Sequence, residues 1–209
     1  MLMSTGIGLG LLGLGNIGSA VARNLKSRCV ILERQLGQSI TVERALVRDL
    51  AKARDVPIPA DRLTTDASAV IEDPDVNVIV EMLGGVDPAH QYIRRSLEAG
   101  KHVVTANKEV MAAHWVDLLQ LAVERGLDLY FEASVGGGIP LIGIFRQNLV
   151  ANEIEEVHAI LNGTTNYVLS QMAELGTDYK TALGEAQVLS LIHISEPTRP
   201  RLISYAVFC

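Results

Sequence analysis

Residues 7–18 read IGLGLLGLGNIG, a short apolar run, Ile7–Leu12, that passes directly into the glycine pattern GxGxxG. In this pattern Gly13 permits a tight turn after a strand, and Gly15 lets the backbone approach a pyrophosphate. Gly18 lets the following helix pack closely on the strand, and the first amides of that helix are donors for a phosphate. The stretch predicts a strand, a turn and a helix that bind a dinucleotide; a glycine-rich turn without a ligand is the alternative.

The helix after this turn is marked by apolar residues at steps of three and four. They are Ile17, Val21, Leu25, Cys29, Leu32 and Leu36. The spacing predicts one face of a single long helix, which Gly37 ends. The β-branched run Ile40–Val47 then predicts the second strand.

The residues at the end of the second strand bear on the choice between the two nicotinamide dinucleotides. An acidic side chain there binds the ribose 2′-hydroxyl of NAD, whereas Arg accommodates the 2′-phosphate of NADP. This chain has Arg48 followed by Asp49, while Glu33, at about the usual distance from the glycines, falls inside the predicted helix. Arg48 therefore favours NADP. Two alternatives are that the protein uses both dinucleotides, or that Arg48 is only a solvated charge at the end of the strand.

Strand and helix signals continue to alternate up to residue 133. The predicted strands are Val76–Leu83, Val103–Ala106 and Leu127–Ala133. One predicted helix has Asp87 as its N-cap and Pro88 as its first residue and ends at Ala99; a second runs from Glu109 to Arg125. Residues 51–75 contain Pro57, Pro59 and Pro74 and predict irregular structure or short elements. Repeated strand-turn-helix units predict an α/β fold with a doubly wound parallel sheet.

The composition of the whole chain excludes several classes of protein. With 209 residues, 48% apolar and 20% charged, the chain is long enough for a packed core and is not intrinsically disordered. A net charge of −6 argues against non-specific nucleic-acid binding. The apolar run 6–15 is shorter than the ~20 residues that span a bilayer, so no membrane partner is expected. Two cysteines exclude a disulfide framework and favour a cytoplasmic protein.

Two charged residues stand where such a sheet carries out chemistry. Lys108 follows the strand Val103–Ala106, at the carboxyl edge where open α/β sheets bind ligands. Its ammonium group suits polarising a carbonyl oxygen, donating a proton or binding an anion; a surface lysine at a helix start is the alternative. Glu132 precedes the glycine-rich residues 135–139, and their backbone carbonyls together with this carboxylate suit a hard cation. A flexible hinge between domains is the alternative interpretation of this loop.

The histidines show no metal-ligand spacing with Cys, Asp or Glu in the sequence. This holds for His90, His102, His114 and His158. We interpret all four as structural and predict no transition-metal site.

The pattern changes after residue 133. A helix is predicted to begin at Pro140, a strand to cover Ile154–Leu161, a helix Tyr167–Leu175, and a last helix, capped by Asp178, to reach Gln187. The sequence thus predicts a nucleotide-binding domain over residues 1–133 and the beginning of a second domain over residues 134–187.

Four segments together resemble the homoserine dehydrogenase family. They are GLLGLGNIGSAV (10–21), EMLGGVDPAHQYIRRSLEAGKHVVTANKEVMA (81–112), YFEASVGGGIPLI (130–142) and LNGTTNYVLSQM (161–172). The resemblance implies a Rossmann-type domain followed by an α+β catalytic and dimerisation domain. It also implies NAD(P)-dependent interconversion of L-aspartate 4-semialdehyde and L-homoserine, in threonine and methionine biosynthesis, by a homodimer.

The resemblance also implies roles for single residues. It places Leu14, Gly15, Asn16 and Ile17 at the cofactor diphosphate, Arg48 at the adenosine phosphate, Lys108 at the nicotinamide and substrate as the catalytic residue, and Gly163 and Thr164 beside the substrate. Glu132 and the carbonyls of Val135, Gly137 and Ile139 match the family's structural sodium site.

Beyond Gln187 the resemblance stops, because the family's acidic, proline-containing stretch and second catalytic lysine are missing. Residues 188–209 read VLSLIHISEPTRPRLISYAVFC and resemble a translated sequencing adapter, so we interpret them as a non-native tail. A truncated chain of this kind is expected to have little or no activity. A non-catalytic NADP-binding module and the dehydrogenase part of a bifunctional aspartate kinase fusion stay open, although Met1 lies close to the first strand and disfavours the fusion.

Overall fold

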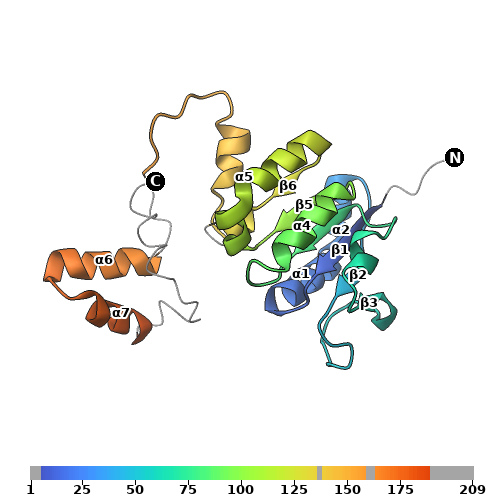
Figure 1. Cartoon of the computed structure of the whole chain (residues 1–209), viewed down its shortest axis with the longest axis horizontal. Coiled ribbons are helices and arrows are strands. Elements are labelled where there is room, and N and C mark those ends of the chain that lie inside the picture. Colours follow the sequence, from blue (N-terminus) through green and yellow to red (C-terminus); the bar gives the residue numbers. More distant parts are fainter. Residues whose placement is uncertain (1–5, 136–137, 159–162, 189–209) are drawn as a thin grey trace. The chain divides into compact units, whose positions relative to one another are not determined.

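The structure is a computed structural model that describes residues 6–135, 138–158 and 163–188 (Figure 1). The chain divides into two compact units, Met1–Arg146 and Gln147–Cys209, which are described separately. The predicted tail beyond Val188 lies outside the described residues.

The first unit is built on a six-stranded sheet with the order β3-β2-β1-β4-β5-β6. The strands are β1 (Ile7–Leu12), β2 (Ile40–Leu46), β3 (Leu63–Thr64), β4 (Val78–Glu81), β5 (His102–Thr105) and β6 (Leu129–Tyr130). Every neighbouring pair is parallel, which confirms the predicted doubly wound sheet. The strand order reverses between β1 and β4, and at such a point the carboxyl ends of the strands border a crevice for a ligand.

Apolar side chains fill both faces of this sheet. Leu11 and Leu12 are adjacent in β1 and fully buried, yet they belong to different apolar clusters because successive strand residues point to opposite faces. One face is covered by α1 (Asn16–Ser27), and the other by α3 (Ser68–Ile71), α4 (Ala89–Glu98) and α5 (Lys108–Arg125). Each buried leucine of this kind stabilises the fold by about 1.5–3 kcal/mol.

The single long helix predicted after the glycine pattern is wrong. The chain leaves helical geometry at Arg28 (φ −112°, ψ 11°), which separates α1 from α2 (Cys29–Leu36). The small residues Gly18 and Ala22 are the buried ones in α1, whereas Ile17 is 55% exposed. Small residues thus lie closest to the sheet in α1, while Leu25 of the predicted apolar stripe is partly buried against the same apolar cluster. Gly37 does end α2, in the predicted left-handed conformation with φ 72°.

Helices α4 and α5 begin close to where the sequence predicts. Pro88 is the N-cap of α4, one position later than the predicted arrangement, so the Asp87 side chain does not cap the helix. In α5 the side chain of Asn107 accepts a hydrogen bond from the amide of Val110 at 3.2 Å, and Gly126 (φ 65°) ends the helix as predicted. Strands β4 and β6 are shorter than predicted, because pairing with their neighbours covers only these residues.

The second unit contains two described helices, α6 (Gly163–Leu175) and α7 (Tyr179–Val188). Asp178 caps α7 as predicted, since its Oδ1 accepts hydrogen bonds from the amides of Lys180 (3.0 Å) and Thr181 (3.2 Å). The predicted strand Ile154–Leu161 is not formed over its described residues, 154–158. A strand requires a neighbouring backbone to pair with, and no described strand pairs with this segment.

The segment between the sheet and these helices also differs from the prediction. The helix expected from Pro140 is reduced to one turn of π-helix, Ile144–Asn148. Across the described ranges, no helix combines the length and apolar character needed to cross a membrane.

Candidate functional site

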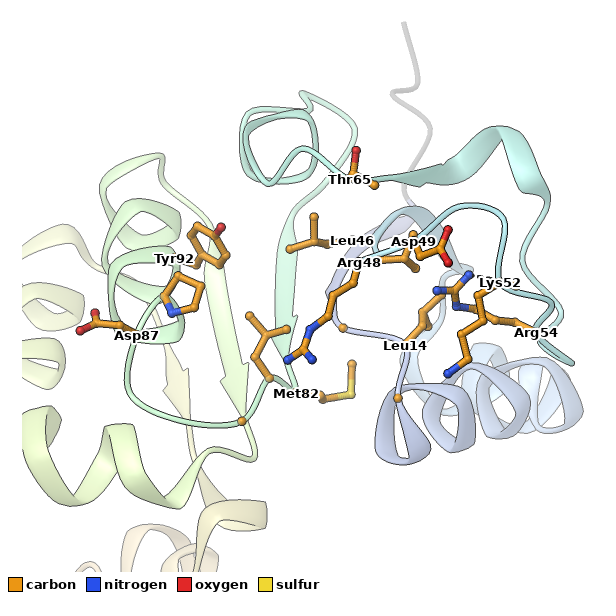
Figure 2. A pocket seen from close by; sticks show the side chains of 16 residues that line it. Leu14, Leu46, Arg48, Asp49, Lys52, Arg54, Thr65, Met82, Asp87 and Tyr92 are labelled. Atoms are coloured by element: carbon orange, nitrogen blue, oxygen red, sulfur yellow. Dashed lines mark hydrogen bonds between the residues drawn. The ribbon is translucent and has the colours of Figure 1, made fainter.

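A cavity of about 600 Å³ opens at the carboxyl ends of β1, β2 and β4, where the strand order reverses (Figure 2). Its lining consists of Gly13, Leu14, Gly15, Leu46, Val47, Arg48, Asp49, Lys52, Arg54, Thr65, Met82, Leu83, Gly84, Asp87, Pro88 and Tyr92. The cavity thus collects the glycine turn, the end of the second strand and the loop after β4 around one space.

The glycine turn forms the floor of this cavity, and each glycine has a separate reason. Gly13 has φ 106°, a conformation that favours glycine. A Cβ on Gly18 would lie 2.1 Å from the backbone oxygen of Gly13, so only glycine fits there. A Cβ on Gly15 would meet nothing within 4 Å, which leaves room for a ligand to approach the backbone.

The start of α1 is suited to an anion. Gly15 is its N-cap, no described side chain caps it, and its first turn holds no acidic residue. The first amides of α1, on Asn16 and Ile17, are therefore left with their partial positive charge at the edge of the cavity. This is the arrangement in which helix N-termini bind phosphate.

The wall formed after β2 is basic. Arg48 reaches into the middle of the cavity, and Lys52 and Arg54 line it from the next loop (Figure 2). The Asp49 carboxylate accepts a hydrogen bond from the amide of Ala51 at 2.8 Å, so it supports the turn of its own loop. Lys52 and Arg54 were missed because residues 51–75 predict only irregular structure or short elements; the three cations within 48–54 were the available signal.

A buried polar network supports the wall formed after β4. Glu81 is fully buried at the end of this strand. Its Oε1 accepts a hydrogen bond from the amide of Leu83 (2.6 Å), and its Oε2 accepts one from Thr105 Oγ1 (2.6 Å). Asn107 Nδ2 donates to the carbonyls of Leu83 (3.2 Å) and Gly85 (2.8 Å). The network thereby ties the cavity loop to the end of β5 and the start of α5.

The predicted site residues are only partly brought together. Gly13, Leu14, Gly15 and Arg48 line the cavity, whereas Asn16, Ile17 and Gly18 lie just behind it in α1. Lys108 is the first residue of α5 and is exposed, and it is not among the lining residues. Gly163 and Thr164 begin α6 in the second unit.

The Glu132 carboxylate is held by backbone amides. It accepts hydrogen bonds from Leu141 (2.6 Å) and Ile142 (3.0 Å) at Oε1 and from Gly143 (2.6 Å) at Oε2. These bonds lower the pKa of Glu132, so it carries its negative charge at neutral pH. A fixed, charged carboxylate whose Oε2 has a single amide partner fits a hard cation. Val135 and Ile139 flank this loop, and Gly137 lies outside the described residues.

Replacing Glu132 by Ala is expected to loosen the 141–143 turn. The three amides lose a charged acceptor, so their hydrogen exchange should accelerate by about tenfold. Because the pKa of Glu132 is lowered in the fold, the wild-type protection is present above its usual value of 4.5 and is lost as the pH falls through the lowered pKa. Exchange measured by NMR or mass spectrometry tests this. Glu124→Ala, whose side chain accepts from Gln120 on an exposed helix face, is the control and should leave the turn unchanged.

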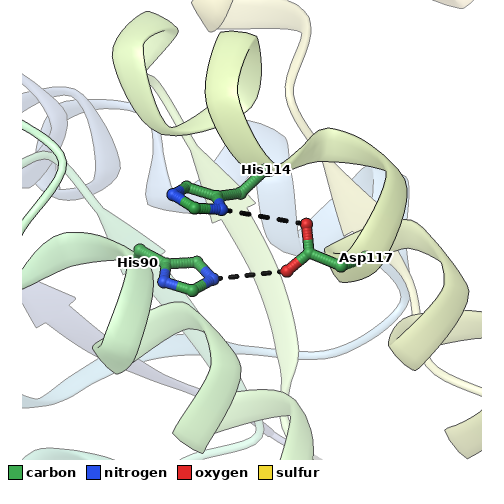
Figure 3. Close-up of side chains that lie close together, drawn as sticks. All are labelled: His90, His114 and Asp117. Carbon is green, nitrogen blue, oxygen red and sulfur yellow. Dashed lines mark hydrogen bonds and ion pairs between the residues drawn. The ribbon is translucent and has the colours of Figure 1, made fainter.

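The structure brings two of the histidines that we interpreted as structural next to one aspartate. His90 of α4 stacks on His114 of α5 with ring centroids 3.9 Å apart, and both rings turn a nitrogen toward Asp117 (Figure 3). His90 Nε2 lies 3.4 Å from Asp117 Oδ2, and His114 Nδ1 lies 3.9 Å from Oδ1. His90 reaches this position only through the packing of two helices, so no local stretch predicts it, although the three-residue spacing of His114 and Asp117 within a predicted helix was an available signal.

Comparison with known proteins agrees with this architecture. A family model described as "Homoserine dehydrogenase, NAD binding domain" matches residues 13–132, and one described as "Homoserine dehydrogenase" matches residues 140–196. The first match covers the glycine turn, strands β2 to β6 and both walls of the cavity, and begins one residue after the end of β1.

Individual relatives are similar over most of this chain. A homoserine dehydrogenase of Bacillus subtilis (strain 168) is 43% identical over 192 residues, 92% of this chain and 44% of that protein. One of Corynebacterium glutamicum is 40% identical over 92% of this chain and 43% of that protein. A crystal structure of a homoserine dehydrogenase from Thiobacillus denitrificans matches with a TM-score of 0.78 at 38% identity, covering 93% of this chain and 44% of that one. This chain therefore spans less than half the length of these relatives.

Proposed function

The chain belongs to the homoserine dehydrogenase family, and from this premise we propose that it binds NADP in the cavity beside the glycine turn. We further propose that it contributes this part of the NAD(P)-dependent interconversion of L-aspartate 4-semialdehyde and L-homoserine. The observation that carries the proposal is the cavity itself, with an uncapped helix N-terminus on one side and three cations on another.

The diphosphate of the cofactor is proposed to lie on the glycine turn. Leu14 and Gly15 line the cavity, and the amides of Asn16 and Ile17 begin α1 directly behind it. The open space around Gly15 supports a close approach of phosphate oxygens to the backbone. The helix dipole of α1 adds a favourable interaction with the negative charge.

The preference for NADP rests on the basic wall. Arg48, Lys52 and Arg54 place three positive charges at the end of β2, while Asp49 is engaged within its own turn. A 2′-phosphate needs cationic donors, whereas a free 2′-hydroxyl needs a carboxylate acceptor. The three cations of this wall therefore favour the 2′-phosphate of NADP.

Arg48→Ala is expected to weaken NADPH binding by about tenfold and to change NADH binding by less than about twofold, because a hydrogen bond to a charged phosphate contributes about 1.5–3 kcal/mol. Isothermal titration calorimetry with both dinucleotides measures this. Arg34→Ala, in the last turn of α2, removes the same charge outside the cavity and should change neither affinity. Equal losses for NADPH and NADH would contradict a role in 2′-phosphate recognition.

The chemical step is proposed to use Lys108. When bound, the dinucleotide supplies the hydride that reduces the aldehyde carbon. Negative charge develops on the aldehyde oxygen, and a nearby ammonium group stabilises this charge and donates the proton. Lys108 stands at the carboxyl end of β5, held at the start of α5 by the Asn107 cap. Gly163 and Thr164 are proposed to border the substrate.

Further properties of the family are proposed for the protein to which this sequence belongs. Glu132, with the carbonyls of Val135, Gly137 and Ile139, would hold a sodium ion, for which the anchored carboxylate is suited. A homodimer formed through the second domain and a cytoplasmic location are likewise proposals, as is the boundary between a nucleotide domain over 1–133 and a second domain over 134–187.

The proposed function is tested by separating binding from turnover. The 209-residue chain is expected to bind NADPH with one site per chain, measured by calorimetry, and to reduce aspartate 4-semialdehyde little or not at all. A full-length protein that contains residues 1–187 and continues from there through the rest of the catalytic domain is expected to oxidise NADPH when the aldehyde is added. If the extended protein binds NADPH without turnover, the non-catalytic binding module is the better description.

A further inference from the structure

Metal-ligating side chains outside the cavity gather at one place in the described part of the chain. His90 lies in the first turn of α4, and His114 and Asp117 lie three residues apart on α5 (Figure 3). One ligand atom from each of the three lies within 4.8 Å of the other two. Nothing in the proposed dehydrogenase chemistry uses these side chains.

The core beneath the cluster fixes the positions of the two helices. Ile93 and Leu97 of α4 and Val110 and Leu118 of α5 are fully buried in the same apolar cluster. The buried side chains therefore set how α4 packs on α5. The backbone of α5 departs from helical geometry at His114 (φ −135°, ψ 15°), and at this bend His114 Nδ1 lies 3.9 Å from Asp117 Oδ1.

The distances suit a tetrahedral metal ion. Ligand atoms about 2.0–2.1 Å from a tetrahedral zinc ion lie about 3.3 Å from one another. His90 Nε2 lies 3.4 Å from Asp117 Oδ2, close to that separation, and His114 Nδ1 lies 3.9 Å from the other oxygen, Oδ1. The two rings are stacked with an angle of 16° between their planes, so one ring has to turn about its side-chain bonds to direct its nitrogen at a shared ion. The contact with His90 is a hydrogen bond at the long end of the range, and a bound ion would replace it.

The donor set and the exposure decide the class of ion. Two imidazole nitrogens and one carboxylate oxygen suit zinc and similar divalent transition metals, whereas sodium and calcium prefer oxygen alone. The side chains of His90, His114 and Asp117 are 20%, 34% and 46% exposed, so an ion can enter from solvent and keep a water ligand.

We propose that His90, His114 and Asp117 bind one divalent transition-metal ion, with zinc as the best-fitting ion and water in the fourth position. The ion joins the first turn of α4 to the middle of α5. The site requires neither dinucleotide nor substrate, so its test is independent of the proposed function.

Calorimetry of the untagged 209-residue chain, first freed of metal with a chelator, tests the proposal with zinc chloride as the probe. One zinc ion per chain is expected to bind. His90→Gln, His114→Gln and Asp117→Asn should each weaken binding by at least about tenfold, since even changes around metal ligands cost that much. His102→Gln is the matched control, because His102 also lies 3.4 Å from an aspartate, Asp128, outside the cluster. This variant should bind zinc as the wild type does.

A measurement on the wild-type chain removes any dependence on how the variants fold. Zinc added to one equivalent should shift the imidazole NMR signals of His90 and His114 and leave those of His102 and His158 in place. The proposal is overturned if no stoichiometric binding occurs, if the signals of His102 or His158 shift instead, or if His102→Gln weakens binding as much as His114→Gln does.

Discussion

Gly18→Ala is expected to lower the free energy of unfolding by about 2–4 kcal/mol, the range for a forced backbone movement in a packed element. The added Cβ would lie 2.1 Å from the Gly13 oxygen and 3.0 Å from its carbonyl carbon, and both are backbone atoms that cannot turn aside. Gly13 in turn lies against Met82, so the glycine turn and the loop after β4 have to separate. Urea unfolding followed by circular dichroism measures the loss.

Gly15→Ala is the matched variant within the same glycine pattern. Its Cβ meets no atom within 4 Å, and the backbone at Gly15 (φ −78°) is open to any residue, so stability should change by less than about 0.5 kcal/mol. NADPH affinity should nevertheless fall by at least about tenfold, because the methyl group occupies the space proposed for the diphosphate. Equal unfolding midpoints for the two variants would count against this division of roles.

Glu81→Ala should destabilise the first unit by about 3 kcal/mol, because the truncation leaves buried donors without an acceptor. The two groups affected are the Leu83 amide and the Thr105 hydroxyl, each 2.6 Å from a carboxylate oxygen in the wild type. The loop after β4 would lose its anchor, and NADPH binding should weaken with it. Glu81→Gln keeps the volume and one acceptor oxygen, so its loss of stability should be clearly smaller. The same destabilisation from both variants would show that the hydrogen bonds are not the cause.

Comparison of the wild type with Glu81→Gln also predicts how the free energy of unfolding depends on pH. Burial raises the pKa of Glu81 above its usual value of 4.5, and hydrogen bonds from Thr105, Leu83 and Asn107 only partly offset this. The folded state then binds the proton more readily than the unfolded chain does. Its stabilising contribution is complete below pH 4.5 and is lost as the pH rises through the raised pKa. The free energy of unfolding of the wild type, measured relative to Glu81→Gln, should therefore fall as the pH rises above 4.5.

Much of the fold was predictable because local signals agree with one another. The glycine pattern, the β-branched second strand and the left-handed caps at Gly37 and Gly126 each depend on backbone conformation within a few residues. The long helix was mispredicted because the apolar periodicity continues across Arg28, where the backbone leaves helical geometry. Only the packing at Gly18 shows that small residues face the core.

Some residues of the candidate site were predictable from the sequence and others were not. Gly13, Leu14, Gly15 and Arg48 were identified in advance and line the cavity, since their positions follow from the ends of two adjacent strands. Lys52 and Arg54 come from a loop without a periodic signal. The roles of Lys108, Glu132, Gly163 and Thr164 stay predictions, because they depend on a bound cofactor, ion or substrate.

The sequence by itself determined the alternation of strands and helices in the first unit, the parallel sheet and the glycine turn, because each is encoded by contiguous residues. The tertiary structure alone decided which distant side chains meet. Glu81 reaches Thr105 across neighbouring strands, and His90 reaches Asp117 across two packed helices. Such contacts depend on strand register and helix packing, which are set by the whole core, so no local stretch of sequence encodes them.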